Sequence, residues 1–303
     1  MKKHITRKYT LNKNIRLNNL IILFISLLGL SLMNSCDIVD GNFERITIID
    51  TNQNVTVPQN ILISEYTGHT CGFCPPAAEE AKRLEKLYPK GRVIFMSVHV
   101  GQFAVPTKDY PEDFRIVEAV RINEQFKITS YPIGEVNRIV NQSGQRAVSF
   151  TEWSSIITPL YEKEAPLSIE FEKGTVNPIT NKINAKINLS YFQDVATNDY
   201  FSLYVVEDSI VSDQKDFRFA PKDHLKDYVH YGILRAVVNG TWGEKVNNGI
   251  KPKKNDKFSY EFEYQIPSNK KWRANHLRLI AFVHDNNNSF VISQVKDKEL
   301  ELE

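Results

Sequence analysis

Two cysteines, Cys71 and Cys74, are separated by two residues and lie between a predicted strand and a predicted helix. The apolar segment 61–66 predicts the strand, and the segment 75–88 predicts the helix. At a helix N-terminus, free backbone N–H groups and the positive end of the helix dipole stabilise a thiolate. The two prolines that follow Cys74 fit the first turn, whose N–H groups have no partner inside the helix. This placement predicts Cys71 as an exposed nucleophile and Cys74, about a turn further in, as the thiol that resolves the intermediate.

The first half of the chain alternates further strands and helices. The segment 93–100 is a continuous apolar run, as expected of a buried parallel strand. The complete set of predicted strands is 46–50, 61–66, 93–100 and 134–140, and the predicted helices are 75–88, 111–126 and 150–162. This alternation is typical of an α/β domain, which we place at residues 43–165.

After Pro166 the pattern changes to a period of two residues. Ile183, Ala185 and Ile187 point to one side of a predicted strand, and the polar residues between them point to the other. The segments 258–266 and 277–283 repeat this pattern between turn-rich stretches. Several short strands with this spacing predict an antiparallel, all-β sandwich-like domain over residues 166–303.

Residues 1–35 form a predicted export signal. They contain six basic residues and no acidic residue, and an apolar run over residues 20–32. That run is shorter than the roughly 20 residues that a membrane-spanning helix requires. Ser35 followed by Cys36 resembles a bacterial lipobox, so we expect lipidation of Cys36, a tether over 36–42 and a location in the cell envelope, facing the periplasm or the outside. An ordinary secretory signal with an incidental cysteine is the alternative.

The charge pattern argues against nucleic acid as a partner. The formal net charge is +2, and without the six basic residues of the export signal it becomes −4. Phosphate binding requires clustered Lys and Arg, and the mature chain is mildly acidic with no basic stripe. We expect no nucleic-acid partner and no cofactor.

The two cysteines, together with Ser130-Tyr131-Pro132 ahead of the strand 134–140, resemble the thioredoxin fold. The resemblance implies that the Tyr131–Pro132 peptide bond is cis, packs against the cysteine pair and offers backbone to a substrate chain. It also implies substrate contacts for Gly72, Phe73 and Tyr131. A trans turn proline is the alternative for Pro132.

Glu65 stands six residues before Cys71, where thioredoxins carry a buried acid. By this resemblance, burial raises the pKa of Glu65, which then accepts the proton of the resolving thiol. The alternative is a solvated carboxylate at the end of a strand. Thr70 replaces the tryptophan that thioredoxins usually carry, and Gly72-Phe73 replaces the usual dipeptide. Because that dipeptide tunes the reduction potential, the direction of exchange stays open.

The segment from Glu65 to Ala77 is also similar to the signature of the outer-membrane-protein-28 family of thioredoxin-like lipoproteins from Bacteroidota. The segments 230–235 and 239–243 extend this similarity over most of the mature chain. The family implies an outer-membrane lipoprotein in which a thioredoxin-like α/β domain is followed by a β domain. It implies no defined substrate, and its naming points to adhesion.

We therefore expect a lipid-anchored thiol–disulfide oxidoreductase that acts on protein or small-molecule disulfides outside the cytoplasm. The alternative from another class is a noncatalytic binding or adhesion lipoprotein on the same scaffold. The cysteines could also form a structural disulfide, or hold a metal ion together with His69 and His99. A structural zinc site needs four ligands and often two CxxC pairs, so we expect no metal. His69 is either a neighbour that lowers the pKa of Cys71 or a surface residue, and His230 receives no role.

Overall fold

The computed structural model describes residues 56–286 and 289–303, and all of these belong to a unit of dense internal contacts that begins at Gln53. The export signal, Cys36, the tether and the predicted strand 46–50 lie outside the described residues. Among the residues that are described, no helix is both long and apolar enough to cross a membrane.

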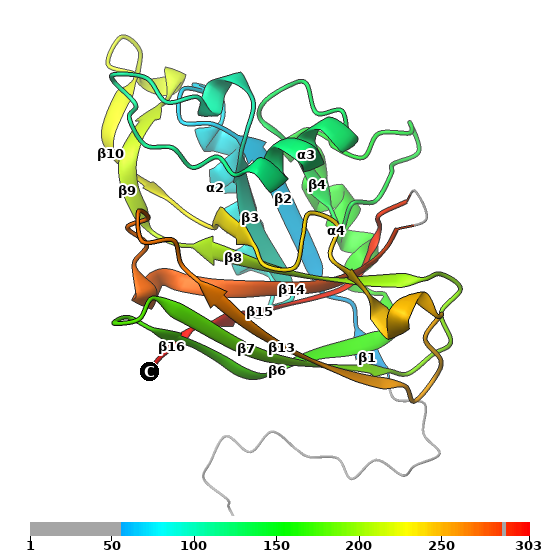
Figure 1. Cartoon of the computed structure of the whole chain (residues 1–303). Helices are drawn as coiled ribbons and strands as arrows, with labels where there is room; N and C mark the ends of the chain where they lie inside the picture. The colour runs from blue at the N-terminus through cyan, green and yellow to red at the C-terminus, as the bar shows by residue number, and fades with distance from the viewer. Residues whose placement is uncertain (1–55, 287–288) are drawn as a thin grey trace, which may run out of the picture. The chain divides into compact units, whose positions relative to one another are not determined.

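A long mixed sheet organises this unit (Figure 1). Its strands follow the order β15-β14-β8-β11-β3-β2-β4, and the short β12 pairs with β8. β3 is parallel to β2 and to β11, whereas the other pairs are antiparallel. The bounds of these strands and of the helices are β2 Ile61–Thr67, α2 Pro75–Leu87, β3 Val93–His99, α3 Val117–Gln125, β4 Ile133–Val136, α4 Trp153–Tyr161, β8 Asp199–Glu207, β11 Ile233–Val237, β12 Glu244–Lys245, β14 Leu277–Asp285 and β15 Ile292–Glu299.

Side chains alternate between the two faces of the long sheet because successive strand residues point to opposite sides. Even-numbered residues of β2 and β3, such as Leu62 and Ile94, share a core cluster with residues of α3. Odd-numbered residues, such as Ile63 and Phe95, share another cluster with α2 and α4. The apolar residues on both sides of these strands therefore require helices on both faces.

A second sheet packs against the part of the long sheet formed by β8 and β14 (Figure 1). Its inner face is apolar, with Ile183 and Ile187 packed in the same cluster as Leu203 and Leu279. The predicted β-sandwich arrangement of the second half is thus confirmed. The strands of this sheet, in spatial order, are β13 Lys257–Gln265, β7 Lys182–Tyr191, β6 Leu167–Asn177 and β16 Glu301–Leu302.

Two antiparallel pairs lie outside both sheets. β1 Val57–Pro58 pairs with β5 Glu164–Ala165, and β9 Ile210–Lys215 pairs with β10 His224–His230. The second pair is a hairpin whose connection contains a short 3-10 helix, Phe217–Phe219.

Two predicted elements are shorter in the structure, for local reasons. The helix expected over 111–126 begins only at Val117, since Phe114 is buried against His99 and the Asp113 side chain accepts a hydrogen bond from the backbone N–H of Arg115. The strand expected over 134–140 ends at Val136, because the next two residues have positive φ angles.

The predicted boundary at residues 165/166 does not separate two cores. Leu62 and Met96 from the first half lie in one cluster with Leu234 and Ile280 from the second half. All seven residues from Phe201 to Glu207 in β8 are buried, so this strand needs cover on both of its faces. In place of two separate domains, 43–165 and 166–303, the second half extends the sheet of the first.

The shared core predicts that both halves lose stability together. Leu234 is 1% exposed in β11, so Leu234→Ala should lower the free energy of unfolding by about 2–5 kcal/mol in urea titrations. Hydrogen exchange should then show reduced protection of the amides of β2 as well as those of β14. Leu302→Ala, at a residue that is 57% exposed, is the matched control. Loss of protection in β14 alone would contradict the shared core.

Candidate functional site

The two cysteines lie in the connection from β2 to α2, as the sequence predicts. They form a disulfide whose Cα atoms are 5.4 Å apart. Gly68 begins this connection, and a Cβ atom there would lie 2.3 Å from the carbonyl carbon of Phe103. Thr70 donates hydrogen bonds to the carbonyl oxygen of Phe103 from its backbone N–H, at 3.1 Å, and from its hydroxyl, at 2.9 Å. The loop is therefore held against the segment that follows β3.

The hairpin of β9 and β10, residues 210–230, covers this loop, and we call it the hairpin cap. Its backbone donates two hydrogen bonds to the cysteine loop: Lys215 N–H to the carbonyl oxygen of His69, at 2.8 Å, and Phe217 N–H to that of Gly72, at 3.0 Å. Gln214 Nε2 donates to the carbonyl oxygen of Cys71 at 3.2 Å. Residues 215–217 of the hairpin cap thus pair with the backbone of residues 69–72 through hydrogen bonds.

An aromatic contact extends this cover. The ring of Phe217 fills the space beside Gly72, where a Cβ atom would lie 2.5 Å from the ring. It also meets the ring of Phe73 edge to face, with centroids 4.9 Å apart. Phe73 itself is 67% exposed.

Arg218 ties the hairpin cap to α2. Its Nη1 and Nη2 donate to the two carboxylate oxygens of Glu79, at 2.8 and 2.7 Å. Its Nε donates to Asp216, whose side chain is fully buried. Hydrogen bonds to Asp216 and Glu79 raise the pKa of Arg218. The ion pair joins the cap to the helix that follows Cys74.

The prediction that Cys71 is exposed is wrong for this structure. Cys71 and Cys74 are each 2% exposed, because the hairpin cap lies over the position where a helix N-terminus alone would meet solvent. Gly72, predicted to contact a substrate, contacts the cap instead. The roles of Cys71 as nucleophile and of Cys74 as resolving thiol stay predictions.

Glu65 is buried beneath the disulfide. It shares with Cys74, His230 and Tyr228 the lining of a small cavity of about 20 Å³, enough for one water molecule. Neither carboxylate oxygen has a hydrogen-bond partner among the described residues. Burial raises the pKa of Glu65 from 4.5 to about 8. The alternative of a solvated carboxylate is therefore excluded.

Three histidines line the boundary between the hairpin cap and the sheet. The ring centroid of His99 lies 6.2 Å from that of His69 and 5.6 Å from that of His230. Burial lowers the pKa of all three, to about 4 for His230 and well below the ordinary value for His99, so they are neutral at pH 7. Within residues 56–286 and 289–303, no three His, Cys, Asp or Glu side chains are arranged to hold a metal ion.

The Tyr131–Pro132 peptide bond is cis, as the resemblance to the thioredoxin fold implies. Tyr131 donates from its hydroxyl to Asn123 on α3 at 2.9 Å, and its ring packs edge to face against Phe103, with centroids 6.1 Å apart. Since Phe103 also accepts the hydrogen bonds of Thr70, it connects the cis peptide to the cysteine loop.

The sequence did not reveal the hairpin cap. Gln214, Phe217 and Arg218 lie more than 130 residues beyond the cysteines in the chain, and no spacing relates the two segments. A second cis peptide, Ala220–Pro221, was not expected either. The sequence offers only the local pattern Phe217-Arg218-Phe219, in which two aromatic residues flank an arginine, and this pattern does not point to the cysteines.

Sequence comparison identifies one family. A sequence model of the family described as outer membrane protein Omp28 matches residues 119–302, which is more than half of the chain and begins after the cysteines. No curated protein sequence matches the chain.

Structure comparison finds a shared fold in HBP35 of Porphyromonas gingivalis. The match covers 80% of this chain and 76% of that one, with a TM-score of 0.61 and 16% identity. A protein of Agrobacterium tumefaciens matches over 82% of this chain and 99% of its own, with a TM-score of 0.48 and 11% identity. A domain of the outer membrane lipoprotein Omp28 from Porphyromonas gingivalis covers 46% of this chain and is itself covered to 91%, with a TM-score of 0.30 and 18% identity.

The contacts of Arg218 predict the rate at which the disulfide can be reached. Arg218→Gln should weaken the closed cap by about 1 kcal/mol and speed reduction of Cys71–Cys74 by dithiothreitol roughly fivefold. Arg83→Gln is the matched control, because Arg83 forms a similar bidentate pair with Glu80 on the outer surface of α2. Equal rates in both variants would mean that the ion pair does not hold the cap closed.

Burial of Glu65 predicts a specific pH dependence of stability. Between pH 4.5 and about 8 the folded protein keeps a proton that the unfolded chain has lost, so stability falls as the pH rises through this window. The slope for this group approaches about 1.4 kcal/mol per pH unit. Glu65→Gln removes this slope. In urea titrations, the free energy of unfolding of the variant should therefore rise relative to that of the wild type from about pH 5 to pH 8. The exposed Glu124→Gln is the control, and a constant difference between Glu65→Gln and the wild type would refute the buried, protonated state.

Proposed function

Because the chain belongs to the outer membrane protein Omp28 family, we propose that it is an outer-membrane lipoprotein that works as a binding protein, with Cys71–Cys74 as a structural disulfide. Family membership agrees with the cell-envelope location that the N-terminal signal predicts. The proposed anchor is an acyl group on Cys36, which lies outside the described residues.

The observation that carries this proposal is the cover over the disulfide. Thiol–disulfide exchange requires that a sulfur atom of the partner reach a sulfur atom of the pair. Here both cysteines are 2% exposed, and backbone hydrogen bonds, an aromatic contact and an ion pair hold the hairpin cap in place. A closed disulfide of this kind resists exchange and instead ties the start of α2 to the loop.

We also propose that the first half has a thioredoxin-like scaffold. Support comes from the element order β2-α2-β3-α3-β4-α4, from the parallel pair β2 and β3, and from the antiparallel β4 directly after the cis proline. Scaffolds of this kind host both catalytic and binding functions, so the scaffold alone does not decide between them.

A second candidate, thiol–disulfide exchange, is favoured by the place of Glu65. This carboxyl lies in one cavity with Cys74, and its pKa of about 8 is close to the ordinary value of about 8.5 for a thiol. Closely matched pKa values allow a proton to pass in either direction between the two groups. Exchange would require displacement of the hairpin cap.

In this second candidate the reduced pair supplies two electrons to a substrate disulfide. The Cys71 thiolate attacks one substrate sulfur, a mixed disulfide forms, and the first substrate thiolate leaves. Cys74 gives its proton to the ionised form of Glu65, a minor population at pH 7, and then attacks the sulfur of Cys71, which releases the second substrate thiolate and closes the Cys71–Cys74 bond. A thiol reductant must then restore the pair.

Redox equilibration in glutathione or dithiothreitol buffers decides between the two candidates. The binding-protein proposal predicts a reduction potential below about −300 mV and no catalysis of insulin reduction. A potential between about −270 and −120 mV, with insulin reduction that is lost in Cys71→Ser, would overturn it in favour of exchange.

The Arg218→Gln variant sharpens this test, because it loosens the hairpin cap without changing the cysteines. Catalysis in Arg218→Gln but not in the wild type would support exchange that is blocked by the cap. Absence of catalysis in both, with both cysteines fully reducible after denaturation, would support the structural disulfide.

A further inference from the structure

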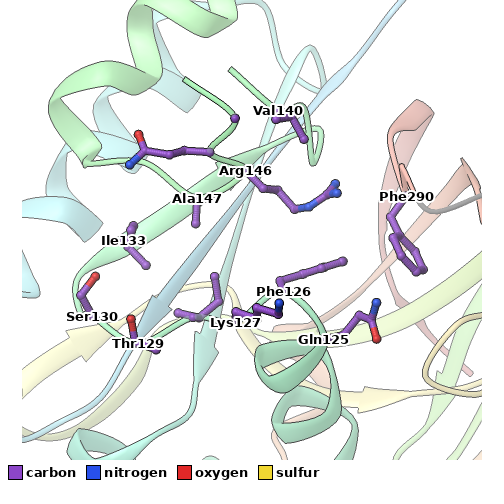
Figure 2. A pocket seen from close by; sticks show the side chains of 13 residues that line it. Gln125, Phe126, Lys127, Thr129, Ser130, Ile133, Val140, Arg146, Ala147 and Phe290 are labelled. Atoms are coloured by element: carbon purple, nitrogen blue, oxygen red, sulfur yellow. The ribbon is translucent and has the colours of Figure 1, made fainter. Parts of the chain in front are cut away.

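A pocket of about 380 Å³ opens at the C-terminal end of α3, beside the residues that lead into the cis Tyr131–Pro132 bond (Figure 2). Its wall is formed by residues 125–130, by the segment 144–147 and by Phe290 near the end of the chain. This volume lies within the range of about 300–1,000 Å³ that is typical of small-molecule sites. None of its lining residues belongs to the cysteine loop or to the hairpin cap.

The lining combines an apolar surface with positive charge. Phe126, Ile133 and Phe290 supply apolar surface, and Lys127 and Arg146 are its charged residues, with no acidic residue among those that line the pocket. Figure 2 shows the Arg146 side chain extending across the pocket above Phe126 and toward Phe290. The guanidinium carbon lies 4.8 Å from the ring centroid of Phe126 and 6.0 Å from that of Phe290.

Only one nitrogen atom of the Arg146 guanidinium forms hydrogen bonds within the described residues. Its Nη1 donates to the backbone carbonyl oxygens of Arg138 and Ser289. Its other nitrogens, Nε and Nη2, take part in none of the hydrogen bonds found among the described residues, and no described carboxylate forms an ion pair with it. The guanidinium is fixed and partly buried, and the charges of Glu135 and Asp285 act on it without a hydrogen bond or ion pair to it among the described residues.

Beneath the pocket, charges of both signs act on Arg146: burial lowers its pKa, the charge of Glu135 raises it, and the charge of Arg138 lowers it. Arg138 lies on the other side, with its guanidinium carbon 5.3 Å from the ring centroid of Phe126. The nearby carboxyl of Glu135 faces Arg138 Nε at 4.0 Å and accepts a hydrogen bond from the hydroxyl of Tyr66 at 3.0 Å. Burial raises the pKa of Glu135, whereas the charges of Arg138 and Arg146 lower it.

We propose that this pocket binds an amphipathic anion, a small molecule with an apolar body and a carboxylate, sulfonate or phosphate group. The apolar body lies against Phe126 and Phe290, and the anionic group accepts hydrogen bonds from Arg146 Nε and Nη2. Thr129, Ser130 and Lys127 also line the pocket and can donate hydrogen bonds to further polar atoms of such a ligand. This inference goes beyond the proposed function, because it involves neither the cysteines nor the cap.

Two fluorescent compounds that differ by the anionic group test the proposal. 8-Anilinonaphthalene-1-sulfonate carries a sulfonate on an aromatic body, and N-phenyl-1-naphthylamine is its neutral counterpart. We expect saturable binding of the sulfonate at one site, weakened about tenfold by Arg146→Met, which keeps an apolar stem but removes the charged donors. The neutral compound should bind Arg146→Met and wild type with the same affinity within a factor of three.

Two further variants keep the test decisive. Arg121→Met removes an exposed arginine of α3 that does not line the pocket, and it should leave the sulfonate affinity unchanged. Val140→Trp places a large ring at a lining residue that is 44% exposed, so the pocket should fill while the fold is kept, and both compounds should lose binding. If circular dichroism shows that Arg146→Met is unfolded, Val140→Trp replaces it as the variant that tests the pocket.

Three results would overturn the proposal. The sulfonate could show no saturable binding, or it could bind Val140→Trp as tightly as the wild type, which would place its site elsewhere. If Arg146→Met lowered the affinities for both compounds equally, Arg146 would not recognise the anionic group, and the pocket would bind only apolar surface. Because the cysteines are unchanged in every variant, these results are independent of the redox measurement that tests the proposed function.

Discussion

The parallel pairing of β11 with β3 is the constraint on which the rest of the structure depends. Ile233 lies opposite Ser97, and through this contact β8, β14 and β15 extend the sheet that β2 and β3 begin. β8 and β14 are buried on both faces, so each face is covered by other elements. The second sheet covers one face, and a core cluster that includes α3 covers the other. The two halves of the chain therefore stabilise each other.

The same pairing brings the hairpin cap to the cysteines. The cap lies in the chain between β8 and β11, and β11 begins opposite a residue near the carboxyl end of β3. The cysteine loop leaves β2 at that end of the sheet, because β2 and β3 are parallel. Because the hairpin cap and the cysteine loop leave the sheet at the same end, the pairing of β11 with β3 places the cap next to the disulfide. Its backbone hydrogen bonds and the contacts of Arg218 then hold it there.

Burial has opposite electrostatic consequences in the two regions of interest. Around the disulfide it favours the neutral forms of Glu65, His99 and His230, so the interior beneath the hairpin cap carries little charge at pH 7. In the pocket beside α3, a guanidinium cannot lose its proton at that pH, so Arg146 keeps its charge, and no carboxylate among the described residues forms a hydrogen bond with it. One region is closed and neutral, and the other is open and cationic. A binding function is thus more readily placed at the pocket than at the cysteines.

Local sequence determined the elements that carry the cysteines, because strand alternation and helix starts act over a few residues. The cis Tyr131–Pro132 bond was implied by the resemblance to the thioredoxin fold and not by local sequence. Local sequence also determined the alternating strands of the second half. Only the tertiary structure decided that Cys71 is buried, that Arg218 reaches α2, and that Arg146 faces a pocket between Phe126 and Phe290. These contacts join residues more than a hundred positions apart or from separate loops. No period or spacing encodes them, since they follow from which strands pair across the sheet.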